Sequence, residues 1–367
     1  MAHGGVAVRL TRWLAMLLAA TLMAGCAAER GVLNYGIPPS LEVNRPMWPT
    51  PKDGEVPRYM YAGQLTGEEN FRTPTQDKQR TGTGTFVHWL LGIFGEDAPP
   101  VILQRPQSGM VDSAGRIFVS DTSAQSVYVF DPLEGRLVVW EGSKGVHFVA
   151  PAGIASGEGG DVYVADSELG VVVRLNQKGE GVGIIGKGEL RRPVGVAFDA
   201  VTHQLFVSDT YGHDIKVFGA DGRLLRTVRQ RGEKPGEFNY PTYIALAKGR
   251  LYVTDTMNAR VQVLDAETGN SELVIGQQGL RVGNLVRPKG VAVDGDGNVY
   301  VVESYYDHLL VYNKKGEFLM PIGGTGQEIG SFYLPSGVWA DEHNRIFVAD
   351  MFNGRVELFQ FLGGDAE

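Results

Sequence analysis

The sequence predicts an all-β fold, a six-bladed β-propeller, from two observations. The first is a unit that recurs six times from about residue 103, at spacings of 42 to 48 residues. The second is the content of each unit, which holds short runs of β-branched and aromatic residues separated by Gly, Asp and Asn turns. A period in the forties with such short strands is typical of propeller blades, each of which is a four-stranded antiparallel sheet.

Two residues mark each unit. A Pro begins the first strand and an acidic residue ends the second, after which a third strand and a weaker fourth follow. The prolines are Pro106, Pro151, Pro193, Pro241, Pro288 and Pro335, and the acids are Asp121, Asp166, Asp209, Asp255, Glu303 and Asp350. The propeller is therefore predicted over residues 103–367.

The sixth unit ends without room for a fourth strand, because only GGDAE follows its third strand, RVELFQFL. An open ring would leave an unpaired sheet edge, which favours aggregation. Residues 58–71, RYMYAGQLTGEENF, resemble the ends of two later units, RLLRTVRQRGEKPGEF (223–238) and EFLMPIGGTGQEIGSF (317–332). We therefore predict that residues 58–71 supply the closing strand of the last blade, so that the two ends of the chain meet in one sheet.

The first 25 residues resemble a bacterial lipoprotein signal. Arg9 and Arg12 precede an apolar run, WLAMLLAATLMAG, that is too short to span a bilayer comfortably. The run ends in LMAGC, which resembles a lipobox, so residues 1–25 are expected to be removed and Cys26 to carry the lipid that attaches the protein to a membrane. Ala27 resembles the sorting residue of outer-membrane lipoproteins. An ordinary secretory signal with a chance Cys is the alternative.

Two further segments lie outside the repeats. Residues 26–57 contain six prolines, which favour extended chain and predict a tether; packing of its second half along the domain is the alternative. Residues 72–102 form an insertion that includes GTFVHWLLGIFG (84–95), expected as a short apolar helix that packs on the propeller before blade one. Contact with a membrane surface or with a partner is the alternative for that segment.

Composition excludes several classes of function. A single Cys in 367 residues excludes internal disulfides, attachment of a c-type haem and a Cys-based zinc cluster. The chain has 34 Lys+Arg against 42 Asp+Glu, a formal net charge of −8, and removal of residues 1–25 takes away two of the arginines. A nucleic-acid-binding face needs concentrated positive charge, so no nucleic-acid partner is predicted.

The loops after the second strands carry the residues that we expect to form a binding face. Apolar residues recur there two positions after the acid, and polar residues recur before the third strand. These loops share one face of a propeller with the loops that lead into the first strands, and aromatic residues beside Arg are typical of a contact surface. The structural alternative is that the acids and arginines hold turns together. The candidate binding face consists of Tyr211, His213, Met257, Arg260, Tyr305, His308, Phe352 and Arg355.

The pattern P-x-G-V-A-x-D … G-x-V-Y-V-x-D-x-x-N-x-R-V-x-V-F-D resembles the NHL repeat. The best copies are GRLYVTDTMNARVQVLD (249–265) and NRIFVADMFNGRVELFQ (344–360). Together with its N-terminal signal, the chain is similar to bacterial NHL-repeat lipoproteins. The resemblance implies a six-bladed propeller, a fold that hosts binding modules, lactonases, lyases and scaffolds alike.

The sequence favours a binding protein over an enzyme. Metal-dependent lactonases of similar fold hold Ca²⁺ with converging oxygen ligands, but no carboxylate follows the recurring prolines. Amidating lyases of NHL type bind zinc through His residues of several blades, and His147, His213 and His308 come from three units; lacking a metal-binding spacing, they are interpreted as scattered surface residues. No catalytic residue, metal or cofactor is predicted. The residues after the prolines are Gln107, Ala152, Val194, Thr242, Lys289 and Ser336.

We therefore expect an outer-membrane lipoprotein whose propeller is a scaffold that binds an envelope protein or a small ligand. One alternative is a metal-dependent lyase or hydrolase with its site on the same face. A second alternative, suggested by the company of the resembled family, is an accessory subunit of an envelope redox or export complex.

Overall fold

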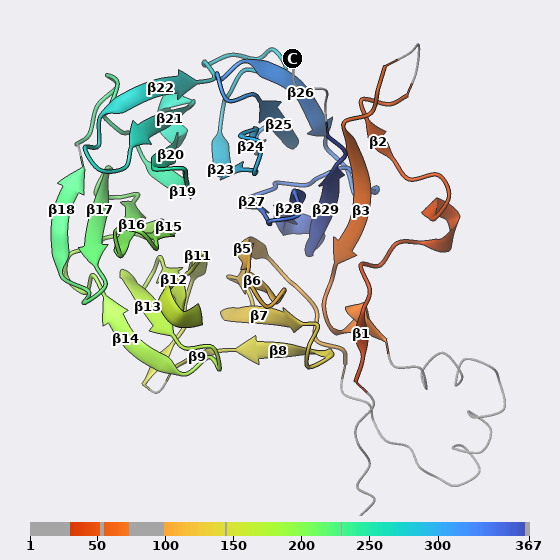
Figure 1. Cartoon of the computed structure of the whole chain (residues 1–367), viewed down its shortest axis with the longest axis horizontal. Coiled ribbons are helices and arrows are strands. Elements are labelled where there is room, and N and C mark those ends of the chain that lie inside the picture. The colour runs from red at the N-terminus through yellow and green to blue at the C-terminus, as the bar shows by residue number, and fades with distance from the viewer. Residues whose placement is uncertain (1–29, 52–54, 73–98, 144, 229, 364–367) are drawn as a thin grey trace, which may run out of the picture. The chain divides into compact units, whose positions relative to one another are not determined.

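The computed structural model describes residues 30–51, 55–72, 99–143, 145–228 and 230–363. Residues 32–71 and 95–367 form one compact unit, whose ring of six β-sheets is viewed down its axis in Figure 1. A second unit, residues 1–31 and 72–94, lies almost wholly outside the described residues. The prediction of an all-β, six-bladed propeller is confirmed.

Each of the six repeats forms one blade, with its strands in chain order from the channel outward. Blade one contains β5 (Pro106–Val111), β6 (Ile117–Asp121), β7 (Ser126–Asp131) and β8 (Arg136–Trp140), and blade two contains β11 (Pro151–Ser156), β12 (Val162–Asp166), β13 (Val171–Leu175) and β14 (Gly181–Ile185). Blade three contains β15 (Pro193–Asp199), β16 (Gln204–Asp209), β17 (Asp214–Gly219) and β18 (Leu224–Val228), and blade four contains β19 (Pro241–Ala247), β20 (Arg250–Asp255), β21 (Arg260–Asp265) and β22 (Ser271–Ile275). Blade five contains β23 (Pro288–Val293), β24 (Val299–Glu303), β25 (His308–Tyr312) and β26 (Phe318–Gly323), and blade six contains β27 (Val338–Ala340), β28 (Arg345–Asp350) and β29 (Arg355–Phe361).

Apolar clusters between neighbouring blades hold the ring together. The second and third strands are largely buried, because their alternating side chains pack against a different neighbour on each face of the sheet. Six clusters result, one at each junction of two blades. The junction of blade six with blade one is packed like the others: the Trp339 and Phe347 rings of blade six stack on each other with centroids 5.5 Å apart, and they share one cluster with Val119 and Phe130 of blade one. The ring is therefore closed by side-chain packing as well as by backbone pairing.

The N-terminal part of the chain completes blade six, as predicted. β3 (Tyr59–Leu65) pairs antiparallel with β29 through six residue pairs. Its alternate side chains, including Tyr61, are buried against the neighbouring blade. Figure 1 shows β3, in orange, beside β29, in dark blue. The stretch 58–71 precedes the first repeat because it contains the missing fourth strand of the last one.

Much of the segment expected as a tether lies against blade six. β2 (Met47–Trp48) pairs with β3 as a fifth strand. The ring of Trp48 meets that of Phe359 edge-on, with centroids 5.3 Å apart. Nearer the N-terminus, β1 (Val32–Leu33) pairs with β4 (Phe71–Arg72). Within residues 26–57, interpreted as a tether with packing of its second half as the alternative, residues 32–33 and 47–48 are therefore paired in sheets.

The described residues contain 3-10 turns but no α-helix. The apolar helix expected at 84–95 lies outside the described residues; of the insertion, the structure describes Arg72 and residues 99–102, where Ile102 forms a β-bridge with Gly67. Within the described ranges, no helix is long and apolar enough to cross a membrane. The remaining short elements are a hairpin of β9 (Gly142–Ser143) with β10 (Val146–His147), and the turns η1 (Pro39–Leu41), η2 (Glu68–Asn70), η3 (Glu158–Gly160), η4 (Thr256–Asn258) and η5 (Met351–Asn353).

Candidate binding face

The recurring acid at the end of each second strand is a structural residue. Asp121 accepts hydrogen bonds from the backbone N–H groups of Gln104 and Arg105 at 2.6 and 2.8 Å. Its other oxygen accepts from two N–H groups of the loop that follows, at 3.0 Å each. The acid therefore ties the loop that leads into the first strand to the loop that leaves the second, and it holds both loops on one face. Equivalent bonds are made by Asp166, Asp209 and Glu303.

Two of the arginines predicted for the binding face take part in the same hydrogen bonding, because they contact the recurring acids. Arg260 donates from Nε to the carboxylate of Asp255 at 2.8 Å, and its remaining nitrogens donate to three backbone carbonyls. Arg355 makes the equivalent 2.8 Å bond to Asp350 and is only 7% exposed. These two arginines therefore hold turns together, as the structural alternative states. We do not include them in the binding face described below.

The predicted apolar residues of the same loops are exposed. Tyr211, Met257, Tyr305 and Phe352 are between 48% and 63% exposed. Two more exposed tyrosines lie beside them in the loops that lead into blades four and six: Tyr240 is 6.1 Å from Tyr211, and Tyr333 is 5.6 Å from Phe352, between ring centroids. We call these six residues the apolar arc. Together they place large apolar side chains on each of blades three to six.

Blades one and two have no aromatic residue or Met two positions after the acid, although the same loop is present there; blade two exposes only the smaller Val149 and Leu169 nearby. Ser123 and Glu168 occupy the positions equivalent to Tyr211 in those two blades. Their loops are held by the same acid and the same backbone bonds as in the other blades. An apolar side chain at this position is therefore not needed to fold a blade, which argues for a role of the arc beyond structure.

Three arginines that sequence analysis missed stack on the apolar arc. Arg105, Arg192 and Arg287 lie over the rings of Phe352, Tyr211 and Tyr305, at 5.1, 5.2 and 5.9 Å from guanidinium carbon to ring centroid. Each contact of this kind is worth about 0.5–1 kcal/mol at an exposed site. Each of these arginines directly precedes the recurring Pro in blades one, three and five, so positive charge alternates around the ring. The Arg-Pro dipeptide of every second repeat is the sequence signal that identifies them.

The predicted histidines of this face have separate surroundings. Nδ1 of His213 accepts a hydrogen bond from the backbone N–H of Tyr240 at 3.2 Å. Burial, together with the charge of Arg231, lowers the pKa of His213, so its ring is neutral at pH 7 and accepts this bond. His308 begins β25, opposite Glu303. In the part of the chain that the structure describes, no three His, Cys, Asp or Glu side chains gather to hold a metal ion.

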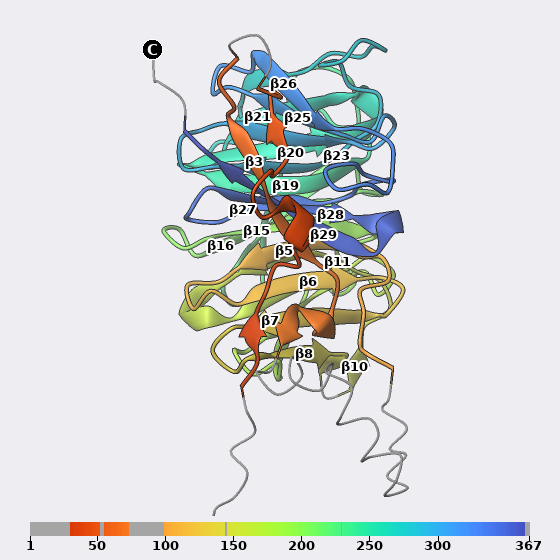
Figure 2. The ribbon, with the colours of Figure 1, turned by 90° about the vertical axis from the view of Figure 1, so that its right-hand side faces the viewer.

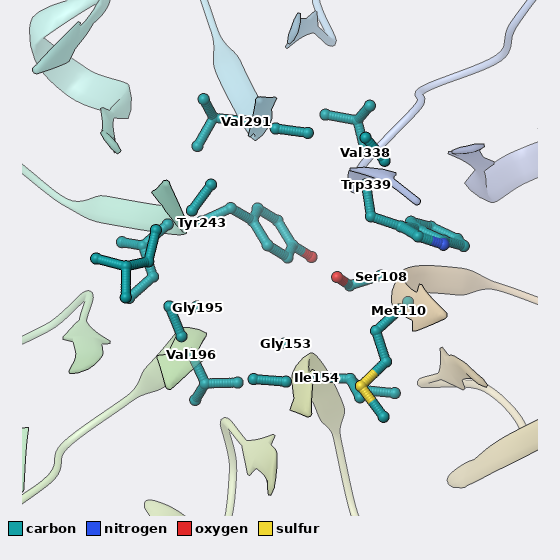
Figure 3. Close-up of a pocket in the computed structure, with 18 of the residues that line it drawn as sticks. Ser108, Met110, Gly153, Ile154, Gly195, Val196, Tyr243, Val291, Val338 and Trp339 are labelled. Carbon is teal, nitrogen blue, oxygen red and sulfur yellow. The ribbon is translucent and has the colours of Figure 1, made fainter. Parts of the chain in front are cut away.

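Tyr243 closes the central channel. Four repeats have Gly two residues after the recurring Pro, because a Cβ there would meet the next strand; on Gly195 it would lie 2.7 Å from the Thr242 carbonyl oxygen. The fourth repeat has Tyr243 instead, and its ring crosses the channel toward Ser108 (Figure 3). The Tyr243 hydroxyl donates to the Gln107 carbonyl at 3.2 Å and lies 3.1 Å from Ser336 Oγ. Burial raises the pKa of Tyr243 to about 12, so the hydroxyl keeps its proton.

A cavity of about 300 Å³ lies within the channel, lined by the first strands of all six blades. Its lining begins at the level of Tyr243 and includes apolar side chains such as Ile154, Val196 and Val338 (Figure 3). The six residues directly after the recurring prolines do not line it. Tyr243 therefore separates the cavity from the channel mouth, which lies on the same side as the apolar arc.

Relatives of known sequence carry the same repeat. The chain is 33% identical over 100 residues to human NHL repeat-containing protein 2, covering 24% of this chain and 14% of that protein. It is 26% identical over 135 residues to Protein brain tumor of Drosophila melanogaster, covering 36% and 12%. The chain is a propeller with NHL-repeat homologues. It spans less than a fifth of the length of these two relatives, and no protein-family model matches it.

Solved structures share the propeller fold. A Bacteroides thetaiotaomicron protein of unknown function aligns with a TM-score of 0.58 at 14% identity, covering 72% of this chain and 71% of that one. A streptogramin B lyase aligns with a TM-score of 0.54 at 14% identity, covering 73% and 96%. A gluconolactonase of Xanthomonas campestris aligns with a TM-score of 0.54 at 14% identity, covering 71% and 89%. At such low identity these similarities show the fold alone.

Proposed function

We propose that this NHL-repeat propeller is a lipid-anchored scaffold of the bacterial envelope, and that it binds a protein partner through the apolar arc and its three stacked arginines. The observation that carries the proposal is the uneven distribution of exposed aromatic residues and Met, which this face carries on blades three to six. Aromatic residues, Met and Arg are enriched at protein interfaces, whereas exposed apolar patches are otherwise costly to a soluble domain. The stacked arginines hold the rings in place, which reduces the side-chain entropy that binding would remove.

Replacement of Tyr211, Tyr305 and Phe352 by Ala is expected to remove partner binding while changing the melting temperature little. Each ring is about half exposed, so its loss leaves no sealed cavity and forfeits mainly one cation–π contact of about 0.5–1 kcal/mol. Thermal unfolding measures the stability. Photo-crosslinking from position 257 detects partner binding, and identification of the crosslinked product names the partner.

A matched control replaces Leu133 and Val201, which are also exposed but lie in strand-connecting turns away from the arc, by Ala. The proposal expects a crosslinked protein that the control retains and the arc variant loses. If the arc variant keeps the same product, or if it unfolds, the arc is not the binding surface. Tyr61→Ala removes a buried aromatic ring instead and is expected to lower the free energy of unfolding by about 3–5 kcal/mol.

The anchor proposed for the scaffold is a lipid on Cys26, with the outer membrane as its location. The support is the LMAGC stretch after an apolar run and the Ala that follows it. Cys26→Ser is expected to abolish acylation and to leave an unprocessed or released protein, because the thiol is the acceptor of the lipid. Labelling with a palmitate analogue, with Cys26→Ala as a second variant, measures this. Labelling that persists in both variants would show that another site carries the lipid.

An enzyme on the same face is the alternative. The similarity to a lyase and a lactonase extends to the fold only, and the described residues bring no three metal-ligating side chains together. Metal analysis of the purified full chain separates the two functions. Stoichiometric zinc or calcium would favour the enzyme, and a scaffold is expected to contain neither.

A further inference from the structure

One amine lies at the mouth of the central channel without a carboxylate partner. Lys289 follows the recurring Pro of blade five, and its side chain is half-buried. The other five residues at this position are all uncharged. No carboxylate of the described residues forms an ion pair with the Lys289 amine. A half-buried ammonium without a counter-charge is unfavourable, so an anionic ligand at this position would stabilise it.

Two of the stacked arginines add to the same positive charge. Arg287 precedes Lys289 by two residues, and Arg105 extends from blade one; neither forms an ion pair within the described residues. Arg192 differs, because Glu168 lies 2.6 Å from its guanidinium. Burial, reinforced by Arg287 and Arg105, lowers the pKa of Lys289. An anion at the mouth would relieve this repulsion.

Neutral hydrogen-bonding groups surround the mouth at the same level. The Thr242 hydroxyl approaches the backbone carbonyl of Lys289 at 3.5 Å on one side. On the other side, Ser336 Oγ and the Gln107 side chain are joined by a 3.2 Å hydrogen bond above the closed channel. The channel mouth therefore combines three positive groups with hydroxyl and amide groups that are hydrogen-bonded within the protein, and the apolar arc lies outside it.

We infer that the channel mouth binds a carboxylate side chain, Asp or Glu, of the protein partner that lies across the apolar arc. The inference rests on the proposed function and adds the chemistry that selects the partner. Arginine and lysine bind carboxylates through charge-assisted hydrogen bonds, which are about twice as strong as neutral ones. The arc supplies apolar contacts suited to the side chains of a polypeptide. The overall negative charge of the chain leaves this mouth as a local exception that attracts an acidic segment.

The probe for this inference is a hexaglutamate peptide, compared with hexaglutamine and with hexauridylate, each bound to the purified full chain at low salt. Hexaglutamate is expected to bind at least about tenfold more tightly than hexaglutamine, because the charge-assisted contacts need the carboxylate. Lys289→Met is expected to weaken hexaglutamate binding about tenfold, and Lys289→Arg to retain it. Lys248→Met is the control, because that amine contacts the carbonyl of Gly295 in a turn at the opposite end of the first strands.

Unchanged hexaglutamate affinity in Lys289→Met would overturn the inference, as would tighter binding of hexauridylate than of hexaglutamate. Thermal unfolding of Lys289→Met separates lost binding from lost folding, and the Arg variant provides a folded reference. Failure of the proposed function gives a different result: the arc variant would keep its crosslinked partner while Lys289→Met still weakened hexaglutamate binding.

Discussion

A chain that lacks residues 27–66 is expected to show no cooperative unfolding transition. The deletion removes β3, and with it the buried side chains of Tyr59, Tyr61 and Leu65. Loss of a buried aromatic residue costs about 3–5 kcal/mol and loss of a buried Leu about 2–5 kcal/mol. The sum approaches the whole free energy of unfolding of an ordinary domain, about 5–15 kcal/mol. Circular dichroism during thermal unfolding measures the result.

The control deletes residues 27–54 only. It keeps β3 but removes β2, whose Trp48 is partly buried against Phe359. This shorter deletion is expected to lower the melting temperature and to leave one cooperative transition. If both deletions unfold alike, ring closure by β3 is not what stabilises the propeller.

The second large effect, on the pH dependence of the free energy of unfolding, is expected from substitution of Glu357, a fully buried acid on β29. One of its oxygens accepts a hydrogen bond from the Gly330 N–H at 3.1 Å, and the other has no partner among the described residues. Arg355 is 3.1 Å away, but its guanidinium is shared with Asp350 and two backbone carbonyls. Burial therefore prevails and raises the pKa of Glu357 to about 8.

Blade four contains the neutral counterpart of this site. Gln262 occupies the equivalent position on β21, and its Oε1 accepts from Gly236 N–H at 2.7 Å. Its Nε2 donates to the Glu237 carbonyl at 2.7 Å and to Asp255 at 3.1 Å. A protonated Glu357 has an O–H where Gln262 has an N–H, so the neutral acid is the closer counterpart of this glutamine.

Glu357→Gln is therefore expected to stabilise the protein at pH 8 and to change little at pH 4. A folded-state pKa above the unfolded value means that the contribution of Glu357 to stability is present below about pH 4.5 and is lost as the pH rises through 8. At 1.36 kcal/mol per pKa unit, the loss reaches at most about 5 kcal/mol. Chemical denaturation of both proteins from pH 4 to 8.5 measures the difference in unfolding free energy, which should grow with pH.

The reverse substitution tests the same reasoning in blade four. Gln262→Glu is expected to introduce a pH-dependent loss of stability, because it places a buried carboxylate beside that of Asp255. Glu342→Gln, at an exposed acid, is the control and should leave the pH profile unchanged. Parallel pH profiles of wild type and Glu357→Gln would show that Glu357 is not protonated in the folded state.

The repeats made the number of blades and their equivalent positions predictable from the sequence. Six equivalent prolines and six equivalent acids fixed the number of blades, and equivalence by position also found the exposed Tyr211, Tyr305 and Phe352. The arginines were harder, because position alone does not say which polar groups a guanidinium reaches. Arg355 has an acid five residues before it in its own loop and is buried, whereas Arg105 crosses from blade one to the Phe352 ring of blade six.

Exceptions to the repeat were the parts that sequence patterns did not reveal. Tyr243 replaces a Gly that close backbone contact requires in four other blades, so its ring has only the channel to fill. β2 consists of two residues, too short for any periodicity to appear, and its pairing depends on β3 being in place first. The Tyr243 hydroxyl contacts residues far away in the sequence, and β2, although it pairs with the nearby β3, packs its Trp48 ring on the distant Phe359. Local propensity does not reveal such long-range contacts.

The pairing of β3 with β29 also constrains the order in which the propeller can fold. About 290 residues separate the two strands in the chain, so this contact closes a very long loop. Figure 2 shows β3 on the side of the ring, across the edge of the blades. During synthesis, β3 emerges before every blade, yet it has no pairing partner in blade six until β29 has followed. Until then each growing chain carries an unpaired strand at one end and an unfinished sheet at the other, and a chaperone that shields sheet edges would find its substrate there.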